Sequence, residues 1–269
     1  MKITAEEIWS AVQAVREKAP IVHSITNYVV MNNTANALLA IGASPVMAHA
    51  EEEMEEMVGI ASALVINIGT LSPAWVRAMF RAAEAARKRK IPIVLDPVGA
   101  GATSYRTRTA RELIRAVPPE IIRGNGSEIM ALVEEDAKTK GVDSSASSDA
   151  AAAIGGILHK QCGAVVCISG ETDYTIGPAG VIKTRNGHLL MTRVTGLGCT
   201  ASALCGAFAA VTTDPALAAA EAMAVIGIAG EIAFARSEGP GTLQLHLLDA
   251  LYRLDADDIE RMLRIETEA

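Results

Sequence analysis

The sequence predicts an α/β protein built on a largely parallel sheet with helices on both faces. Short apolar segments alternate with helical segments along most of the chain, which is typical of parallel strands buried on both sides. Half of the 269 residues are hydrophobic and only 3% are aromatic, so the expected core is aliphatic. A chain of this length can form one large core without disulfides, and we expect a single domain over residues 1–269.

Capping and stop signals define the first elements. Thr4 and Glu7 form a capping box, and apolar residues at helical spacing follow until Pro20 ends the pattern. Ser72 and Pro73 mark another helix start, because Pro is favoured at the first helical position. The expected strands are 21–25, 44–47, 63–68, 91–95, 120–123 and 164–168. The expected helices between them are 31–41, 51–58, 73–90, 107–117 and 126–135, and one more follows a polar loop at 137–148 whose Ser-rich end, 144–148, we expect to be exposed.

The pattern changes after residue 172. Strand-like segments with polar interruptions occupy 172–194, and Asn186-Gly187 predicts the tight turn of an antiparallel hairpin at the sheet edge. From Cys199 onward every expected element is helical: 199–211, 215–236, 243–254 and 257–265. The sequence therefore predicts a mostly parallel sheet with an antiparallel edge and a helical C-terminus.

Charge and composition exclude several classes of protein. The 24 Lys and Arg against 31 Asp and Glu give a net charge of −7, so we expect no nucleic-acid partner. Apolar stretches are interrupted before the roughly 18 residues that a membrane span needs, and residues 1–7 lack a signal sequence. We therefore expect a cytoplasmic protein. Cys162, Cys167 and Cys205 have apolar neighbours and are expected in the core as free thiols.

A glycine turn at residues 195–200 is the sharpest local feature. A strand pattern ends there, Gly196 and Gly198 follow, and a long apolar helix begins, which predicts an anion site at the helix start. No second strand with a terminal acid follows, so a dinucleotide site is disfavoured, and no P-loop motif is present. Cys199 would lie in the first turn, where we expect its pKa to fall below about 8.5. Its alternative role is that of a small buried residue at the helix start.

Other polar residues follow the predicted parallel strands. Arg123 and Asn125 come at the end of one strand, Asp96 at the end of another and Ser169 at the end of a third. The carboxyl ends of parallel strands meet at one edge, so these side chains should gather there. Glu128 could hold a hydrated Mg²⁺ or only face the positive end of its helix.

The N-terminal part adds a polar cluster at 23–27 next to apolar strands. Asn27 could bind a ligand, or it could serve a turn or cap, which is a common role of Asn. Met47 could form an adaptable wall for a small apolar ligand or belong to the core.

The order of these segments resembles the hydroxyethylthiazole kinase family of the ribokinase-like superfamily. The segments that carry the resemblance are 23–27, 67–70, 96–100, 124–128, 173–174 and 195–199. Together they lie within residues 20–242, nearly the whole chain. Two positions depart from the family pattern: Ser169 is more often Thr, and Leu197 replaces a more usual Thr in the glycine turn.

The resemblance implies transfer of the ATP γ-phosphate to the hydroxyl of 4-methyl-5-(2-hydroxyethyl)thiazole, with Mg²⁺, in thiamin salvage. It also implies a homotrimer with active sites between subunits. The implied thiazole contacts are Asn27, Met47 and Gly196, and the implied nucleotide contacts are Arg123, Asn125 and Ser169. Glu128 and Asp96 would serve the metal, and Cys199 would stand where superfamily relatives place a catalytic Asp.

Three alternatives remain open at the level of sequence. A related kinase could act on a hydroxymethylpyrimidine or a sugar. An acyl-transfer enzyme could use Cys199 as nucleophile with His23 as its base. A ligand-binding protein without catalysis is the third.

Overall fold

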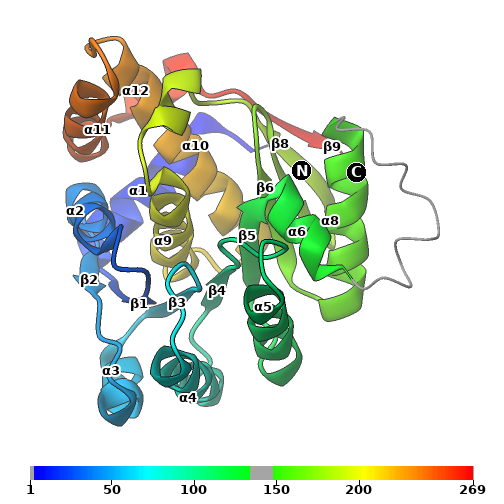
Figure 1. The fold of residues 1–269 in the computed structure, drawn as a ribbon. Helices are drawn as coiled ribbons and strands as arrows, with labels where there is room; N and C mark the ends of the chain where they lie inside the picture. Colours follow the sequence, from blue (N-terminus) through cyan, green and yellow to red (C-terminus); the bar gives the residue numbers. More distant parts are fainter. Residues whose placement is uncertain (1–2, 134–147, 269) are drawn as a thin grey trace.

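The computed structural model describes residues 3–133 and 148–268, and a nine-stranded sheet runs through them (Figure 1). The strand order is β2-β1-β3-β4-β5-β6-β7-β8-β9. The strands from β2 to β6 are parallel, whereas β7, β8 and β9 extend the sheet in antiparallel fashion. Their bounds are β1 (Ile21–Ile25), β2 (Ser44–Val46), β3 (Ala63–Asn67), β4 (Ile93–Asp96), β5 (Ile121–Asn125), β6 (Val165–Ser169), β7 (Asp173–Gly177), β8 (Gly180–Thr184) and β9 (Ile265–Glu268).

Helices cover both faces of the sheet, as the sequence predicts (Figure 1). One face carries α1 (Ala5–Lys18), α2 (Met31–Ile41), α9 (Leu197–Ala209), α10 (Pro215–Phe234), α11 (Pro240–Arg253) and α12 (Ala256–Met262). The other carries α3 (Met54–Ile60), α4 (Pro73–Arg89), α5 (Ser104–Ala116), α6 (Gly126–Leu132) and α8 (Ser148–Cys162). Two short 3₁₀ segments, Glu51–Glu53 and Leu189–Arg193, complete the described elements.

Alternation along the strands separates the two cores. In β3, Val65 belongs to the core under α9, whereas Leu64 and Ile66 belong to the core under α4. Successive strand residues point to opposite faces, so each apolar strand supplies both cores at once. This explains why the parallel strands are continuously apolar.

Helix α10 corrects one expectation about the apolar stretches. Pro215–Phe234 is long and apolar enough by composition to cross a membrane, with a mean hydropathy of 1.7, and 78% of that window is buried inside the protein. Its neighbours are α9, α11 and the sheet. A helix that is apolar all round suits a core position, and α10 occupies one.

The antiparallel edge differs from the prediction in two ways. The β7–β8 hairpin turns at residues 178–179, whereas Asn186-Gly187 lies beyond β8. Gly187 does have a left-handed φ of 131°, but the dipeptide joins no hairpin. The C-terminal end is also not wholly helical, because Ile265–Glu268 forms β9 and pairs with β8.

The remaining elements agree with prediction to within a few residues. One shift of three residues is at α5, which begins at Ser104 because Thr103 caps it. Cys167 and Cys205 are buried as expected, whereas Cys162 is only half-buried. The predicted exposed loop at 144–148 and most of the polar segment around it lie outside the described residues.

Candidate active site

The carboxyl ends of the parallel strands bring the predicted polar residues to one edge of the sheet. Asn67 at the end of β3 pairs in register with Asp96 at the end of β4. Asn125 at the end of β5 pairs with Ser169 at the end of β6. Register therefore places side chains that are far apart in sequence next to one another.

The glycine turn before α9 meets the loop after β1. Gly196 has a φ of 84°, and a Cβ there would lie 2.5 Å from Val30 Cγ1, so only glycine fits without strain. No side chain within the described residues caps α9 at Gly196. The first backbone N–H groups of the helix therefore remain available to an anion, as predicted.

A buried chain of hydrogen bonds connects this turn to three strands. Asn27 Nδ2 donates to Asn67 Oδ1 at 2.9 Å and to Cys199 Sγ at 3.4 Å. Asn67 Nδ2 donates to Asp96 Oδ2 at 2.8 Å, and Ser202 Oγ donates to the same oxygen at 2.8 Å. The structure thus unites Asn27, Asp96 and Cys199 with Asn67, which lies in the resemblance segment 67–70 but was given no role, and with Ser202, which sequence did not single out.

Cys199 does not have the lowered pKa that its place at a helix start predicted. Burial and the nearby Asp96 carboxylate raise its pKa to about 11, against the opposing hydrogen bonds from Asn67 and Asn27. The local helix signal is overridden because the thiol is desolvated beside a negative charge. At neutral pH the thiol is protonated.

His23 is occupied elsewhere. Its Nε2 lies 2.9 Å from the carbonyl oxygen of Ala48, and burial lowers the pKa of the imidazole. The hydrogen bonds described for the Cys199 thiol involve amides and no imidazole. A nucleophilic Cys–His pair therefore finds no support in this arrangement.

Arg123 lies beneath the edge of the sheet and not on it. It is 7% exposed, and a Cβ on Gly198 would come within 2.8 Å of its Nη1, so the guanidinium fills the space under the first turn of α9. The carboxylates of Asp96 and Asp173 favour the charged form of the Arg123 guanidinium. Its Nε has no hydrogen-bond partner among the described residues. A buried guanidinium with a free donor below a helix start would favour an anion.

Asp96 has an unusual environment for a carboxylate. Burial raises its pKa to about 6, although Arg123 and the hydrogen bond from Ser202 act in the opposite direction. Asp173, at the start of β7, likewise has a pKa raised to about 6 by burial. Such shifts concentrate at functional sites.

Glu128 and Asn125 cap α6 reciprocally. Asn125 Oδ1 accepts from the Glu128 backbone, and Glu128 Oε2 accepts from the Asn125 backbone at 2.9 Å. Glu128 Oε1 also accepts from Gly99 N at 2.8 Å, which ties the loop after β4 to the end of β5. Ser169 Oγ lies 3.5 Å from the Gly124 carbonyl.

The donor set at this edge, Glu128 and Asp96, is of the kind that a hydrated magnesium ion uses. The charge of Glu128 contributes to the raised pKa of the Asp96 carboxyl, so the two carboxylates interact electrostatically, and each Glu128 oxygen accepts one backbone hydrogen bond. Among the described residues, no three His, Cys, Asp or Glu side chains form a site of their own for a metal. Mg²⁺ commonly binds one or two carboxylates, waters and substrate phosphates, which suits this donor set.

Two other residues bear on the site. Met47 follows β2 at the same edge and packs partly against the core. No hydrogen bond of its side chain to the buried chain of Asn27, Asn67 and Asp96 is seen among the described residues.

Arg106 was not singled out by sequence, yet its guanidinium donates to three carbonyls, those of Ile68, Gly69 and Val98, at 2.7–2.8 Å. It clamps the loops after β3 and β4, a role that has no local sequence signal.

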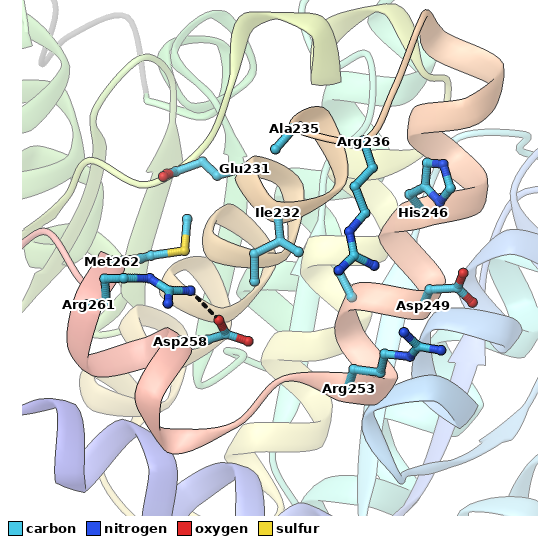
Figure 2. Close-up of a pocket in the computed structure, with 11 residues that line it drawn as sticks. Glu231, Ile232, Ala235, Arg236, His246, Asp249, Arg253, Asp258, Arg261 and Met262 are labelled. Carbon is cyan, nitrogen blue, oxygen red and sulfur yellow. Dashed lines mark hydrogen bonds and ion pairs between the residues drawn. The ribbon is translucent and has the colours of Figure 1, made fainter.

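A cavity lies elsewhere, between α10, α11 and α12 (Figure 2). Its volume is about 530 Å³ and none of the candidate site residues lines it. The lining residues are Glu231, Ile232, Ala235, Arg236, His246, Asp249, Ala250, Arg253, Asp258, Arg261 and Met262. Charged side chains of both signs face it and Arg261 pairs with Asp258, so the cavity selects no single ligand charge.

Comparison with known proteins decides the family. The profile of the hydroxyethylthiazole kinase family matches residues 12–257. The chain belongs to the hydroxyethylthiazole kinase family. A hydroxyethylthiazole kinase of Syntrophus aciditrophicus is 66% identical over 98% of both chains, and one of Leptospira biflexa is 56% identical over 98% of this chain and 97% of its own.

Solved structures agree with the family and its fold. A hydroxyethylthiazole kinase protein from Pyrococcus horikoshii superposes with a TM-score of 0.91 at 43% identity, over 98% of this chain and 100% of the other. The pyridoxal kinase of Staphylococcus aureus gives a TM-score of 0.64 at 14% identity over 92% and 97% of the two chains, a likeness of fold alone. The ribokinase-like fold predicted from sequence is confirmed.

Proposed function

We propose that the protein transfers the γ-phosphoryl group of ATP to the hydroxyl of 4-methyl-5-(2-hydroxyethyl)thiazole. Membership of the family supports a kinase that acts on this small alcohol. The observation that carries the proposal is the uncapped start of α9, which lies over the buried Arg123 and beside Asp96 and Asn27. Phosphoryl transfer requires mainly positioning and charge stabilisation, which these groups supply.

Each side chain has a proposed role. Arg123 and the first N–H groups of α9 would stabilise the charge on the transferred phosphoryl group, and Asn125 and Ser169 would orient the nucleotide. Glu128 and Asp96 would hold Mg²⁺, which when bound neutralises phosphate charge. Asn27, Met47 and Gly196 would contact the thiazole.

Cys199 would lie next to the substrate hydroxyl. Its raised pKa keeps the thiol neutral, so it would orient the hydroxyl and would not remove its proton early. A loose phosphoryl-transfer transition state places little demand on a base, because bond formation to the hydroxyl oxygen is late. A protonated thiol is therefore compatible with turnover.

We further propose a homotrimer with sites between subunits. Tyr28 and Val29, directly after Asn27, are each 64% exposed, and Leu189, before the glycine turn, is 80% exposed. Large exposed apolar side chains near a site often mark an interface with another chain. Light scattering on the purified protein tests this assembly, and a monomer at micromolar concentration would contradict it. A cytoplasmic location remains part of the proposal.

An ADP-release assay tests the activity. The purified protein is mixed with ATP and hydroxyethylthiazole, a hydroxymethylpyrimidine or ribose, with and without Mg²⁺. We expect the thiazole with Mg²⁺ to give the fastest release. Faster release with either other alcohol would refute the substrate, and no release with any would refute the kinase activity.

Charge placement is tested separately. Arg123→Ala should weaken ATP binding, whereas Glu128→Gln should raise the Mg²⁺ concentration needed for half-maximal rate. Both are measured together with thermal unfolding. Unchanged ATP and Mg²⁺ dependence in folded variants would contradict the assigned roles.

A further inference from the structure

We propose that Asn67 is a positioning residue for the reaction, because one side chain holds both the Asn27 amide and the Asp96 carboxylate. The inference rests on the proposed function, in which Asn27 contacts the thiazole and Asp96 serves the metal. Asn67 itself touches neither ligand in that scheme. It would act through the two residues that do.

Both ends of the Asn67 amide are used. It is the last residue of β3 and is 1% exposed. Its Nδ2 donates to Asp96 Oδ2 at 2.8 Å, and its Oδ1 accepts from Asn27 Nδ2 and from Gly69 N, each at 2.9 Å. A primary amide is the short neutral side chain that offers a donor and an acceptor on separate atoms. The position therefore uses the full capacity of an asparagine.

The Asn27 amide depends on this contact for its orientation. The other described partner of Asn27 Nδ2 is Cys199 Sγ at 3.4 Å, and sulfur is a weak acceptor. Asn27 Nδ2 is directed to Asn67 and Cys199, and no hydrogen bond from a described residue is seen to Asn27 Oδ1. It can accept a hydrogen bond from a ligand donor such as a hydroxyl.

The Asp96 carboxylate is held by the same residue from the other side. Its Oδ2 accepts from both Asn67 and Ser202, at 2.8 Å each. These two donors fix the plane of the carboxylate and leave Oδ1 without a described partner. Groups that orient a metal-binding carboxylate in this way typically contribute 10–100-fold to affinity or activity.

The structure therefore couples substrate binding to turnover through one side chain. Loss of Asn27 should weaken thiazole binding alone, and loss of Ser202 should affect the Asp96 side alone. Loss of Asn67 should affect both. A residue that only stabilised the fold would lower the melting temperature and leave the kinetics of the folded protein unchanged.

The test is a double-mutant cycle on the full chain. Thiazole Kd is measured by calorimetry without ATP, and kcat and KM are measured by ADP release, for the parent, Asn67→Ala, Asn27→Ala and the double variant. We expect Asn67→Ala to lower kcat/KM for thiazole by about 10–100-fold, through a lower kcat and a higher Kd. Asn27→Ala should raise Kd in the parent but change it less than twofold in the Asn67→Ala background.

Asn186→Ala is the matched control. Asn186 is also buried, at 7% exposure, and its amide makes three contacts, with Glu231, the Met262 carbonyl and Arg264 N. It lies beyond β8, outside the proposed site. We expect it to lower the melting temperature while kcat and KM stay within about twofold of the parent.

The outcomes separate the two proposals. A parent that neither binds nor phosphorylates the thiazole would refute the proposed function, and the inference would fall with it. An active parent with additive effects of Asn27→Ala and Asn67→Ala on Kd, or with parental kcat in folded Asn67→Ala, would overturn the inference alone. If Asn67→Ala does not fold, Asn67→Ser takes its place and the same loss of kcat and the same coupling are required.

Discussion

Glu221 makes the stability of the protein depend on pH in a predictable direction. It lies on α10, is 2% exposed and accepts a hydrogen bond from Thr212 Oγ1 at 2.7 Å. Burial raises the pKa of its carboxyl from 4.5 to about 8, and the charges of Glu7 and Asp214 act in the same direction. The folded protein therefore keeps a proton on Glu221 at neutral pH that the unfolded chain has lost.

The sign and size of the effect follow from proton linkage. Below pH 4.5 both states hold the proton, and above about pH 8 neither does. Between these values the folded state binds one more proton than the unfolded state. The free energy of unfolding therefore falls by about 1.4 kcal/mol for each unit by which the pH rises. Over the whole window the loss amounts to about 5 kcal/mol, a large part of the stability of a typical domain.

The substitution that isolates this effect is Glu221→Gln, which keeps the shape and an acceptor for Thr212 but cannot ionise. We expect the variant to unfold with nearly parental free energy at pH 5 and to become the more stable protein by pH 8. Urea unfolding at pH 5, 6, 7, 8 and 9 gives the difference at each step. A stability difference that does not change with pH would refute the assignment of a raised pKa to Glu221.

Three further outcomes are expected. Cys199→Ala should retain measurable kcat, because the parental thiol is already protonated at neutral pH, and complete loss in a folded variant would contradict this. Gly206→Ala should lower the free energy of unfolding by about 1–3 kcal/mol in a urea titration, because the added Cβ would lie 2.6 Å from Val65 Cγ2. Gly59→Ala should raise the free energy of unfolding in the same titration, because no atom lies within 4 Å of the added Cβ and Ala favours a helix. Arg106→Met should lower the free energy of unfolding by at least about 2 kcal/mol, because three backbone carbonyls lose a charged hydrogen-bond donor. Thermal unfolding measures this, and a parental melting temperature would show that these hydrogen bonds are not needed for stability.

Helix starts and ends that depend on neighbours in the sequence were predicted correctly in several places. The capping box of Thr4 and Glu7 starts α1, and Gly42 ends α2 with a φ of 105°. Such signals act over three or four residues, so the chain carries them before it folds. The parallel sheet could also be predicted from local patterns, because continuously apolar strands alternating with helices are typical of parallel strands buried on both faces.

Features that depend on a distant partner could not be predicted in this way. The segment Ile265–Glu268 has little apolar character, and it is a strand because β8 presents an edge to it. Asn186-Gly187 has the composition of a hairpin turn, but the strand that would complete a hairpin does not follow it. Strand pairing is set by the whole sheet and local composition is only a weak guide to it.

The candidate site shows the same division. That Asp96, Arg123, Asn125 and Ser169 would gather could be expected, because the carboxyl ends of parallel strands meet at one edge of the sheet, whereas only the family resemblance placed Asn27 and Cys199 with them. Only the tertiary structure decided their charge states and contacts. Cys199 has a raised pKa because folding buries it beside Asp96, and Asn67 joins Asn27 to Asp96 because three separate strands deliver them within hydrogen-bond distance. Desolvation and long-range proximity arise on folding, so the sequence by itself determines which groups are present and the fold determines how they ionise.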